Sequence, residues 1–139
     1  MLKVSVSGSM RINEKKVLEI LEDLNNKFGW EKTILLVGDN PSGVDRLALE
    51  TLDSKEENTY IYYSYKKGYR EKARVSCEGC KYVAVESNAY GRAFNTAKDE
   101  KMINNSDIVV VIHSNSQGSL RNIQQAKESN KKLLEYYVD

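Results

Sequence analysis

The clearest indication of the fold of this chain is the segment Asp107-Ile-Val-Val-Val-Ile-His-Ser-Asn-Ser-Gln-Gly-Ser-Leu-Arg-Asn-Ile-Gln-Gln-Ala126. Residues 108–112 are apolar and mostly β-branched, and such a run predicts a strand covered on both faces, as strands of parallel sheets are. A polar turn with a glycine follows, and apolar residues then recur at helical spacing, at Leu120, Ile123 and Ala126. Ser116 or Ser119 can cap the first turn of this helix. A strand, a short loop and a helix start leave unpaired N–H groups at the positive end of a helix dipole, which suits a phosphate or a sugar hydroxyl.

The same unit of strand, glycine loop and helix occurs twice nearer the N-terminus. Residues 2–7 alternate between apolar and polar, stop at Gly8, and are followed by a helical stripe that Asn13 can cap. Residues 33–37 form a second apolar run, which breaks at Gly38 into a Gly/Ser loop before another helical stripe. Repeated units of this kind predict an α/β fold, a single Rossmann-like, doubly wound, mostly parallel sheet flanked by helices. Sheets of this class bind ligands beyond the carboxyl ends of their strands.

The middle of the chain is less regular. Further strands are expected over 59–65, 82–85 and 133–138, with a charged loop over 66–75 and a mostly helical segment over 90–103. Asn130 can end the last helix. Five tyrosines fall between residues 60 and 69. Their rings either cover the surface of the sheet or of a subunit contact, or they stack on a nucleobase.

Composition narrows the range of partners. The chain has 139 residues, which is most simply one domain spanning 1–139. Its 21 basic and 20 acidic side chains nearly cancel, so charge gives no footprint for nucleic acid, and no basic cluster indicates a membrane surface. No apolar run approaches the roughly 20 residues that a membrane span needs. We therefore expect a cytoplasmic protein with neither nucleic acid nor a membrane as its partner.

Cys77 and Cys80 are the only cysteines. A structural zinc site usually takes four protein ligands, and with His113, the only histidine, one chain offers at most three cysteine and histidine ligands. We expect a reduced pair with no special role, and a disulfide or a metal shared between subunits are the alternatives. No cofactor and no metal are expected within one chain.

Four short motifs, in their order along the chain, resemble those of the SLOG superfamily. They are Gly8-Ser9 after the first strand, Gly38-x4-Gly43-Val44-Asp45-x2-Ala48 after the second, Asp99-x2-Met102-x4-Asp107 before the buried strand, and Ser116-x-Gly118-Ser119-x3-Ile123-x2-Ala126 after it. The resemblance spans residues 8–126 but leaves 55–88 uncovered. It implies a compact Rossmann-like domain that binds a nucleotide or a nucleotide-derived small molecule, and a homo-oligomer.

Some SLOG relatives are enzymes that cut an N-glycosidic bond, as phosphoribohydrolases and nucleoside deoxyribosyltransferases do. In those proteins a Gly-Thr-x-x-Glu pattern places a carboxylate three residues after the threonine. Here Ser119 holds the threonine position and Asn122 the glutamate position. An amide can hold a ribose hydroxyl but cannot act as a nucleophile or as a general base at neutral pH. The departure favours binding without turnover, and no residue is assigned a catalytic role.

Other SLOG domains sense signals, as in the effector of the Thoeris anti-phage system, which recognises a cyclic ADP-ribose derivative. The leading hypothesis is therefore a protein that binds a nucleotide-derived signal, cyclic or linear, without turnover. A phage protein of this kind would lower the free concentration of a signal that the host uses for defence. One alternative is an N-glycosidic-bond enzyme in which Asp99 or Glu100 replaces the missing glutamate. Another is a non-catalytic assembly or adaptor module that uses its tyrosine-rich middle for contacts.

The candidate ligand site combines the glycine loops with nearby polar side chains. The loops would supply N–H groups and hydroxyls to phosphates, and their glycines would let the backbone approach the ligand. Arg11 would pair with a phosphate, and the aspartates would bind ribose hydroxyls or a base edge. The predicted ligand-binding residues are Gly8, Ser9, Arg11, Gly38, Asp39, Gly43, Asp45, Asp99, Ser116, Gly118, Ser119 and Asn122. Arg92 is expected on a solvated helix face, and His113 either contacts the ligand or is structural.

Overall fold

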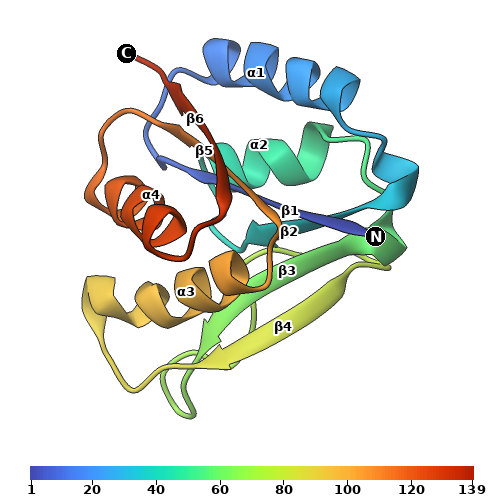
Figure 1. Cartoon of the computed structure of the whole chain (residues 1–139). Coiled ribbons are helices and arrows are strands. Elements are labelled where there is room, and N and C mark those ends of the chain that lie inside the picture. The colour runs from blue at the N-terminus through green and yellow to red at the C-terminus, as the bar shows by residue number, and fades with distance from the viewer.

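Six parallel strands form a single sheet in the computed structural model, which describes residues 1–139 (Figure 1). The strands are β1 (Leu2–Gly8), β2 (Thr33–Gly38), β3 (Thr59–Tyr65), β4 (Lys81–Glu86), β5 (Ile108–His113) and β6 (Lys132–Tyr137). Their order across the sheet is β4-β3-β2-β1-β5-β6, and every neighbouring pair is parallel. The predicted α/β class is therefore confirmed. The strand order reverses between β1 and β5, which is where sheets of this class bind their ligands.

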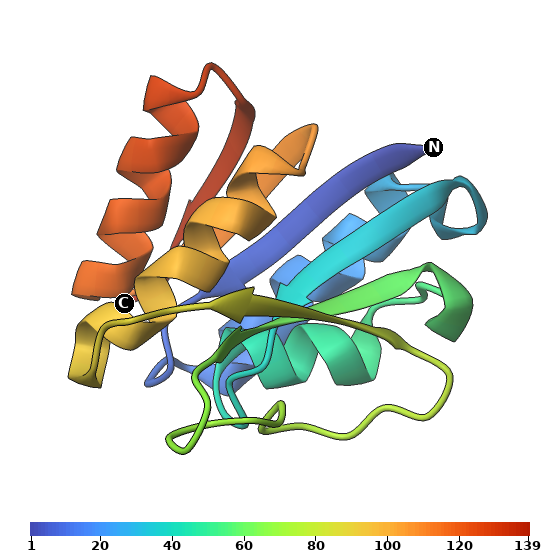
Figure 2. The same cartoon turned by 90° about the horizontal axis from the view of Figure 1, so that it is seen from below.

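Helices cover both faces of the sheet (Figures 1 and 2). On one face lie α1 (Glu14–Lys27) and α2 (Val44–Thr51), and on the other α3 (Thr96–Asn104) and α4 (Gln117–Glu128). Three short 3-10 helices complete the chain: η1 (Trp30–Lys32), η2 (Glu56–Asn58) and η3 (Gly91–Asn95). No helix combines the length and the apolar character that crossing a membrane would require.

Local signals in the sequence set the helix ends. The side chain of Asn13 caps α1 by accepting a hydrogen bond from the N–H of Lys16 at 3.2 Å. Asn130 follows α4 in the left-handed region, at φ 54°, as expected of a residue that ends a helix. The segment expected to be mostly helical over 90–103 divides into η3 and α3, which meet at Thr96.

Strand β5 is buried along its whole length because each face of the sheet has its own apolar cluster. Ile108, Val110 and Ile112 belong to the larger cluster, which also contains residues of α1 and α2. Val109 and Val111 belong to a second cluster, with residues of α3 and α4. The unbroken apolar run therefore serves two layers of the core at once, and this requirement places β5 inside the sheet rather than at its edge.

The chain between β3 and β4 crosses the sheet as a loop, residues 66–80, without a helix of its own. Val75 and both cysteines of this loop pack against the larger apolar cluster. Cys77 and Cys80 form a disulfide, with their Cα atoms 5.4 Å apart. The expectation of a reduced pair is therefore wrong. The chain turns tightly here, with the N–H of Cys80 donating to the carbonyl of Cys77 at 3.3 Å, and the turn brings the two sulfur atoms together.

Candidate ligand-binding site

A pocket of about 390 Å³ lies at the carboxyl end of β1, between the N-terminal parts of α2, α3 and α4. Sixteen residues line it, and only one of them, Met10, is hydrophobic. Seven of the predicted residues lie in its wall: Gly8, Asp45, Asp99, Ser116, Gly118, Ser119 and Asn122. The pocket therefore occupies the place where the strand order reverses, and its wall suits a ligand rich in hydrogen-bonding groups.

The first turn of α4 faces the pocket without a side-chain cap. Ser116 is the N-cap residue, but its hydroxyl hydrogen-bonds the hydroxyls of Ser9 (2.8 Å) and Ser119 (2.9 Å) rather than an N–H group of the helix. The N–H groups of Gln117, Gly118 and Ser119 have no intrahelical acceptor, as at any helix start. Together with the positive end of the helix dipole, these donors favour an anion in the pocket.

Ser9 and Arg11 lie outside the pocket wall. Ser9 is buried, and its hydroxyl accepts a hydrogen bond from the N–H of Ser114 at 3.0 Å. Arg11 is exposed, and its backbone carbonyl accepts from the hydroxyl of Ser114 at 3.1 Å. In this structure both residues therefore hold the loop after β1 to the loop that leads into α4, and neither reaches the pocket.

The glycines at the site differ in what surrounds them. A Cβ atom on Gly8 would lie 1.9 Å from the carbonyl oxygen of Ile112 in the neighbouring strand. Gly43 has a φ of 75°, and a Cβ there would lie 2.5 Å from the carbonyl oxygen of Ser9. A Cβ on Gly118 would meet nothing within 4 Å. Gly8 and Gly43 therefore allow chain segments to touch one another, whereas Gly118 leaves open space that a ligand can occupy.

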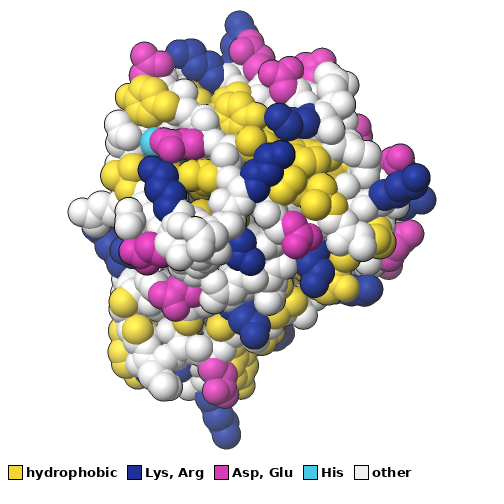
Figure 3. All heavy atoms as spheres, viewed as in Figure 1, with side chains coloured by type: hydrophobic (Ala, Val, Ile, Leu, Met, Phe, Trp, Pro, Cys, Tyr) yellow, Lys and Arg dark blue, Asp and Glu magenta, His cyan; other side chains and the backbone are white.

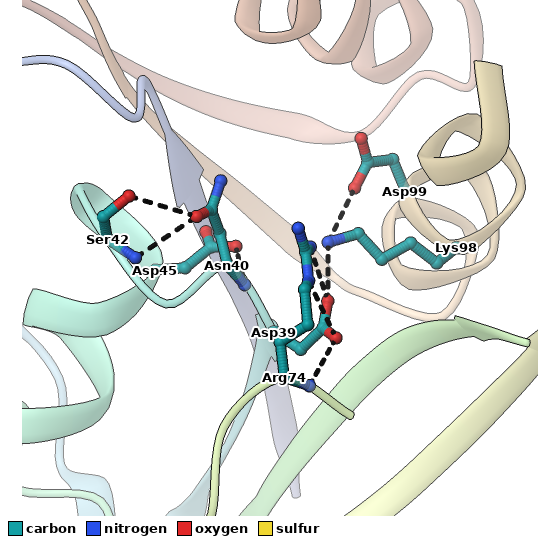
Figure 4. A network of polar contacts seen from close by, with 7 residues as sticks. All are labelled: Asp39, Asn40, Ser42, Asp45, Arg74, Lys98 and Asp99. Carbon is teal, nitrogen blue, oxygen red and sulfur yellow. Dashed lines mark hydrogen bonds and ion pairs between the residues drawn. The ribbon is translucent and has the colours of Figure 1, made fainter. Parts of the chain in front are cut away.

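Asp39 anchors a buried network of charges behind the pocket (Figure 4). Its carboxylate accepts hydrogen bonds from Nη2 (2.8 Å), Nε (3.2 Å) and the backbone N–H (3.0 Å) of Arg74, and from Nζ of Lys98 (3.3 Å). Burial opposes ionisation, but these donors and the charge of Lys98 outweigh it and hold the pKa of Asp39 below its ordinary value. Gly38 leaves room beside the network, since a Cβ there would lie 2.5 Å from Oδ2 of Asp45. Neither Asp39 nor Gly38 lines the pocket, so their role here is to support it.

Asp45 and Asp99 place two carboxyl groups in the pocket wall. Burial raises the pKa of Asp45 to about 6, against the positive charge of Lys98 and with the help of the negative charge of Asp99. Burial also raises the pKa of Asp99, against the charges of Lys98 and Arg121 and a hydrogen bond with Asn122. The ammonium of Lys98 lies 4.0 Å from Oδ1 of Asp99 (Figure 4). Asp45 thus exchanges its proton close to neutral pH.

Replacing Asp45 with asparagine is expected to stabilise the protein at about pH 7, by roughly 1–3 kcal/mol. The folded chain holds the Asp45 proton more tightly than the unfolded chain, so the wild type loses stability as the pH rises from about 4 to about 6. A shift of about two pKa units, at about 1.4 kcal/mol each, sets the upper limit of this loss. The amide keeps the size of the side chain and can still accept from the N–H of Asn40, which lies 3.3 Å from Oδ2.

Urea unfolding of Asp45→Asn and of the wild type, at about pH 4 and about pH 7, measures this effect. The gain in the free energy of unfolding of Asp45→Asn over the wild type should be near zero at about pH 4 and should reach its full size at about pH 7. Asp23→Asn, at an exposed position of α1, is the control and should change stability little at either pH. A gain of equal size at both pH values would contradict the explanation by proton binding.

Four basic side chains line the pocket, and none of them is among the predicted site residues: Arg74, Arg92, Lys98 and Arg121. Lys98 is 4 % exposed and lies one helical turn before the buried Met102. The sequence does contain a signal for Lys98: a lysine at helical spacing from an apolar residue is expected to be buried on the apolar side of the helix. Arg92, expected on a solvated helix face, is exposed but also lines the pocket, and its Nη1 donates to Oε1 of Gln117 at 3.3 Å. This hydrogen bond joins η3 to the start of α4.

His113 is buried and does not line the pocket. Its Nδ1 accepts a hydrogen bond from the N–H of Asn115 at 3.1 Å, so the ring proton is on Nε2, which donates to Glu135 at 3.0 Å. The ring also meets that of Tyr137, with the centroids 5.8 Å apart. Of the two alternatives for His113, the structure therefore supports the structural one, in which the ring fixes the start of the loop before α4.

Two amide oxygens in the pocket wall lack a hydrogen-bond partner. Asn122 is 5 % exposed, and its Nδ2 donates to the hydroxyl of Ser7 at 3.4 Å, but its Oδ1 is buried and unpaired. Oδ1 of Asn95 is likewise buried and unpaired. A buried acceptor without a donor costs about 1–3 kcal/mol, and a ligand hydroxyl or amino group would remove that cost. A ligand with hydrogen-bond donors would therefore suit this part of the wall.

No protein-family model matches this chain, and no curated protein sequence matches it. Among solved structures it is similar to DNA processing protein A from Helicobacter pylori, with 17% sequence identity and a TM-score of 0.67, over 96% of this chain and 64% of that one. It is also similar to the molybdenum cofactor carrier protein from Chlamydomonas reinhardtii in two structures, at 14% and 15% identity with TM-scores of 0.66 and 0.64. The match covers 97% and 96% of this chain and 75% of the carrier protein. This chain spans less than two thirds of the DNA processing protein, and at such identities the likeness shows the fold alone.

The exclusion of nucleic acid as a partner, made from the net charge, is contradicted by one of these neighbours. The structure of DNA processing protein A describes a single-stranded DNA binding mode, so a protein that contains this fold binds nucleic acid. Acidic and basic side chains are interspersed on the face shown in Figure 3, and the net charge of the whole chain is +1. A balanced total says little about one pocket, however: four cations line this pocket with two carboxyl groups, and Asp39 behind the wall pairs with two of the four, Arg74 and Lys98. The field that a ligand meets is set by these local charges.

Proposed function

We propose that this chain is a SLOG-type domain whose pocket holds a phosphate group of a nucleotide-derived ligand without turnover. The observation that carries the proposal is the uncapped first turn of α4, in a wall that also contains three guanidinium groups and one ammonium group. Helix N-termini bind phosphates through backbone N–H groups, and guanidinium groups bind them through paired charge-assisted hydrogen bonds. Both kinds of donor meet in a pocket of about 390 Å³, which is of the size of small-molecule sites.

The rest of a nucleotide suits the remaining wall. The unpaired amide oxygens of Asn122 and Asn95, and the carboxylate of Asp99, can accept hydrogen bonds from ribose hydroxyls or from a base edge. The resemblance to SLOG domains implies the same class of ligand. Single-stranded DNA, which DNA processing protein A binds, is likewise built of phosphorylated nucleosides. The proposal therefore covers a free nucleotide derivative and the end of a single strand.

Asn122 at the position of the family's catalytic glutamate supports binding without turnover. We extend the proposal to sequestration of a signal of the cyclic ADP-ribose type, as the resemblance to signal-sensing SLOG domains suggests. Sequestration needs only affinity and abundance, because each bound molecule is removed from the free pool by mass action.

Phosphorylated ligands are expected to raise the melting temperature of the chain, and to be recovered intact. The ligands to compare are AMP, ADP-ribose, 3′,5′-cyclic AMP and a short oligothymidylate, with adenosine and ribose as controls without phosphate. A ligand at about 100 times its Kd stabilises the folded chain by about 2.7 kcal/mol, so the shift should grow with concentration. Chromatography of the ligand released by heating then shows whether it has been changed.

The proposal predicts no shift with adenosine or ribose. It fails if none of the phosphorylated ligands shifts the melting temperature, or if adenosine does so as strongly as AMP.

A specific observation favours a second candidate, an N-glycosidic-bond enzyme. Asp99 lies beside Asn122 in the pocket wall, and Asp45, with its pKa of about 6, could give or take a proton close to neutral pH. Glu100, the other carboxylate considered from the sequence, does not line the pocket. This candidate predicts free base and a ribose phosphate in the same incubations, in place of intact ligand.

A further inference from the structure

We propose that a cluster of aromatic and basic side chains beside the pocket is a stacking platform for a nucleobase of the bound ligand. The cluster consists of Tyr69, Tyr90, Phe94, Lys66 and Arg70, and is called the aromatic cluster below. The inference rests on the proposed function, since it assigns a place to the base of a ligand whose phosphate lies in the pocket.

The aromatic cluster lies where β3 and β4 end, at the same edge of the sheet as the pocket. After β3 the chain makes a tight turn in which the N–H of Lys66 donates to the carbonyl of Arg70 (2.8 Å) and the N–H of Arg70 to that of Lys66 (2.9 Å). Gly68 occupies the left-handed region at the tip of this turn. The ammonium of Lys66 donates to the carbonyl of Asn88, after β4, at 2.9 Å. The two segments that carry the rings are therefore tied together before any ligand arrives.

One ring of the cluster is an anchor and two are open to solvent. Phe94 is buried, whereas Tyr69 is 47 % and Tyr90 is 63 % exposed. The ring of Tyr69 meets those of Tyr90 and Phe94 edge to face, with centroids 5.0 Å apart in both pairs. Packing against Phe94 accounts for the position of Tyr69, whereas Tyr90 remains mostly exposed although Tyr69 and Lys66 contact its ring.

Cations accompany the rings. Nζ of Lys66 lies 3.5 Å from the centroid of Tyr90, and the guanidinium carbon of Arg70 lies 5.3 Å from that of Phe94. Exposed aromatic rings interleaved with cations are the pattern by which proteins hold unpaired nucleotides, because the rings stack on bases and the cations attract the backbone phosphates.

A short helix joins the aromatic cluster to the pocket. Phe94 belongs to η3 and Tyr90 immediately precedes it, while Arg92 and Asn95 of η3 line the pocket. With three residues per turn, positions 92 and 95 share one side of a 3-10 helix and position 94 lies on another. The helix η3 therefore adjoins both sites, and the proposal places the phosphate of the ligand on the side of Arg92 and its base beside Tyr90.

The experiment compares Tyr90→Ala and Tyr90→Phe in their binding to AMP, to ribose 5-phosphate and to a short oligothymidylate, by isothermal titration. Tyr90→Ala should weaken the binding of the two base-containing ligands about tenfold, the size expected for loss of one stacking ring. It should leave ribose 5-phosphate within about twofold, and Tyr90→Phe should resemble the wild type. Tyr60→Ala is the matched control, because Tyr60 also carries a lysine near its ring, with Nζ of Lys81 at 5.2 Å, but lies near the amino end of β3.

Photocrosslinking tests the contact directly. A 5-iodouracil nucleotide should attach to Tyr90 or Tyr69, as mapped by mass spectrometry of the peptides. A single strand is the source of the base if two results hold. Oligothymidylate should bind more tightly than thymidine monophosphate, and its binding should be lost in Tyr69→Ala as well as in Tyr90→Ala. Equal affinities for the two would identify a free nucleotide.

The failures of the two proposals are distinguishable. If AMP binds and Tyr90→Ala binds it as well as the wild type does, the platform is overturned and the phosphate site stands. If the tyrosine variant weakens ribose 5-phosphate as much as AMP, the ring acts on the pocket and not on a base, which also overturns the platform. If no phosphorylated ligand binds the wild type, both proposals fall.

Discussion

Replacing Lys98 with methionine is expected to lower the free energy of unfolding by about 3 kcal/mol or more at about pH 7, the largest single loss of stability at this site. The ammonium lies among three carboxyl groups: it donates to Asp39, lies 4.0 Å from Asp99, and lowers the pKa of Asp45 by its charge. Methionine fills a similar volume but leaves Asp39 with Arg74 as its remaining partner, and removes the ammonium charge that favours the ionised forms of Asp45 and Asp99. Removing one member of a buried ionic group costs more than the group contributes as a whole, because the remaining charges lose their partner.

Low pH should reduce the loss of stability caused by Lys98→Met. Protonation of Asp45 and Asp99 removes the negative charges that Lys98 balances, and both have raised pKa values, so the destabilisation should be smaller at about pH 4 than at about pH 7. Urea unfolding at the two pH values measures this difference. Lys101→Met, at an exposed position of the same helix, is the matched control and should change stability little. An equal loss at both pH values would show that lost packing, not charge, is responsible.

Replacing Gly118 with leucine should abolish ligand binding and leave the fold intact. Space around Gly118 is open, and the residue lies in the first turn of α4, where leucine has a better helix propensity than glycine by up to about 1 kcal/mol. A leucine there would occupy the pocket and shield the N–H groups at the helix start. Loss of two charge-assisted hydrogen bonds, at about 1.5 kcal/mol each or more, corresponds to roughly 100-fold weaker binding.

Titration of AMP and a melting curve on the same samples test the prediction. Gly118→Ala should lie between the wild type and the leucine variant in affinity, because a methyl group fills less of the pocket. Binding retained in the leucine variant would mean that the ligand does not use the start of α4. A variant that melts well below the wild type would instead mean that this position supports the fold.

The architecture could be predicted because burial leaves a local pattern in the sequence. The run over 108–112 is apolar throughout, since alternate residues face two different layers of helices, and this alone indicates a central parallel strand. Ser116, Gly118 and Ser119 were identified by the same logic, as a loop between such a strand and a helix. Arg11 shows the limit of this logic: it lies in the right loop, but its side chain does not reach the pocket.

The basic side chains of the site could not be predicted, because they lie far along the chain from the carboxylates that they meet. Asp39 is 35 residues from Arg74 and 59 from Lys98, and no motif records that the three would meet. Arg74 lies in a loop whose sequence has no helical or strand periodicity. Only the folded chain therefore shows that its guanidinium meets Asp39, the residue that follows β2. The same holds for the net charge, which is a sum over the surface and carries no information about where four cations gather.

The two sides of the pocket differ in how freely they can change during evolution. On the side of β1, the backbone of Gly8 touches the carbonyl of Ile112, and the N–H of Ser9 donates to that same carbonyl at 3.1 Å, so almost any larger residue would part the strands. On the opposite side, Arg74 is held by Asp39 from a loop that forms no helix or strand. Substitutions at exposed positions of this loop, such as Lys67, Glu71 and Lys72, can therefore accumulate while Arg74 and the residues packed against the core keep their positions. Homologues that recognise different molecules should diverge in that loop, and a laboratory selection for altered specificity is best directed there.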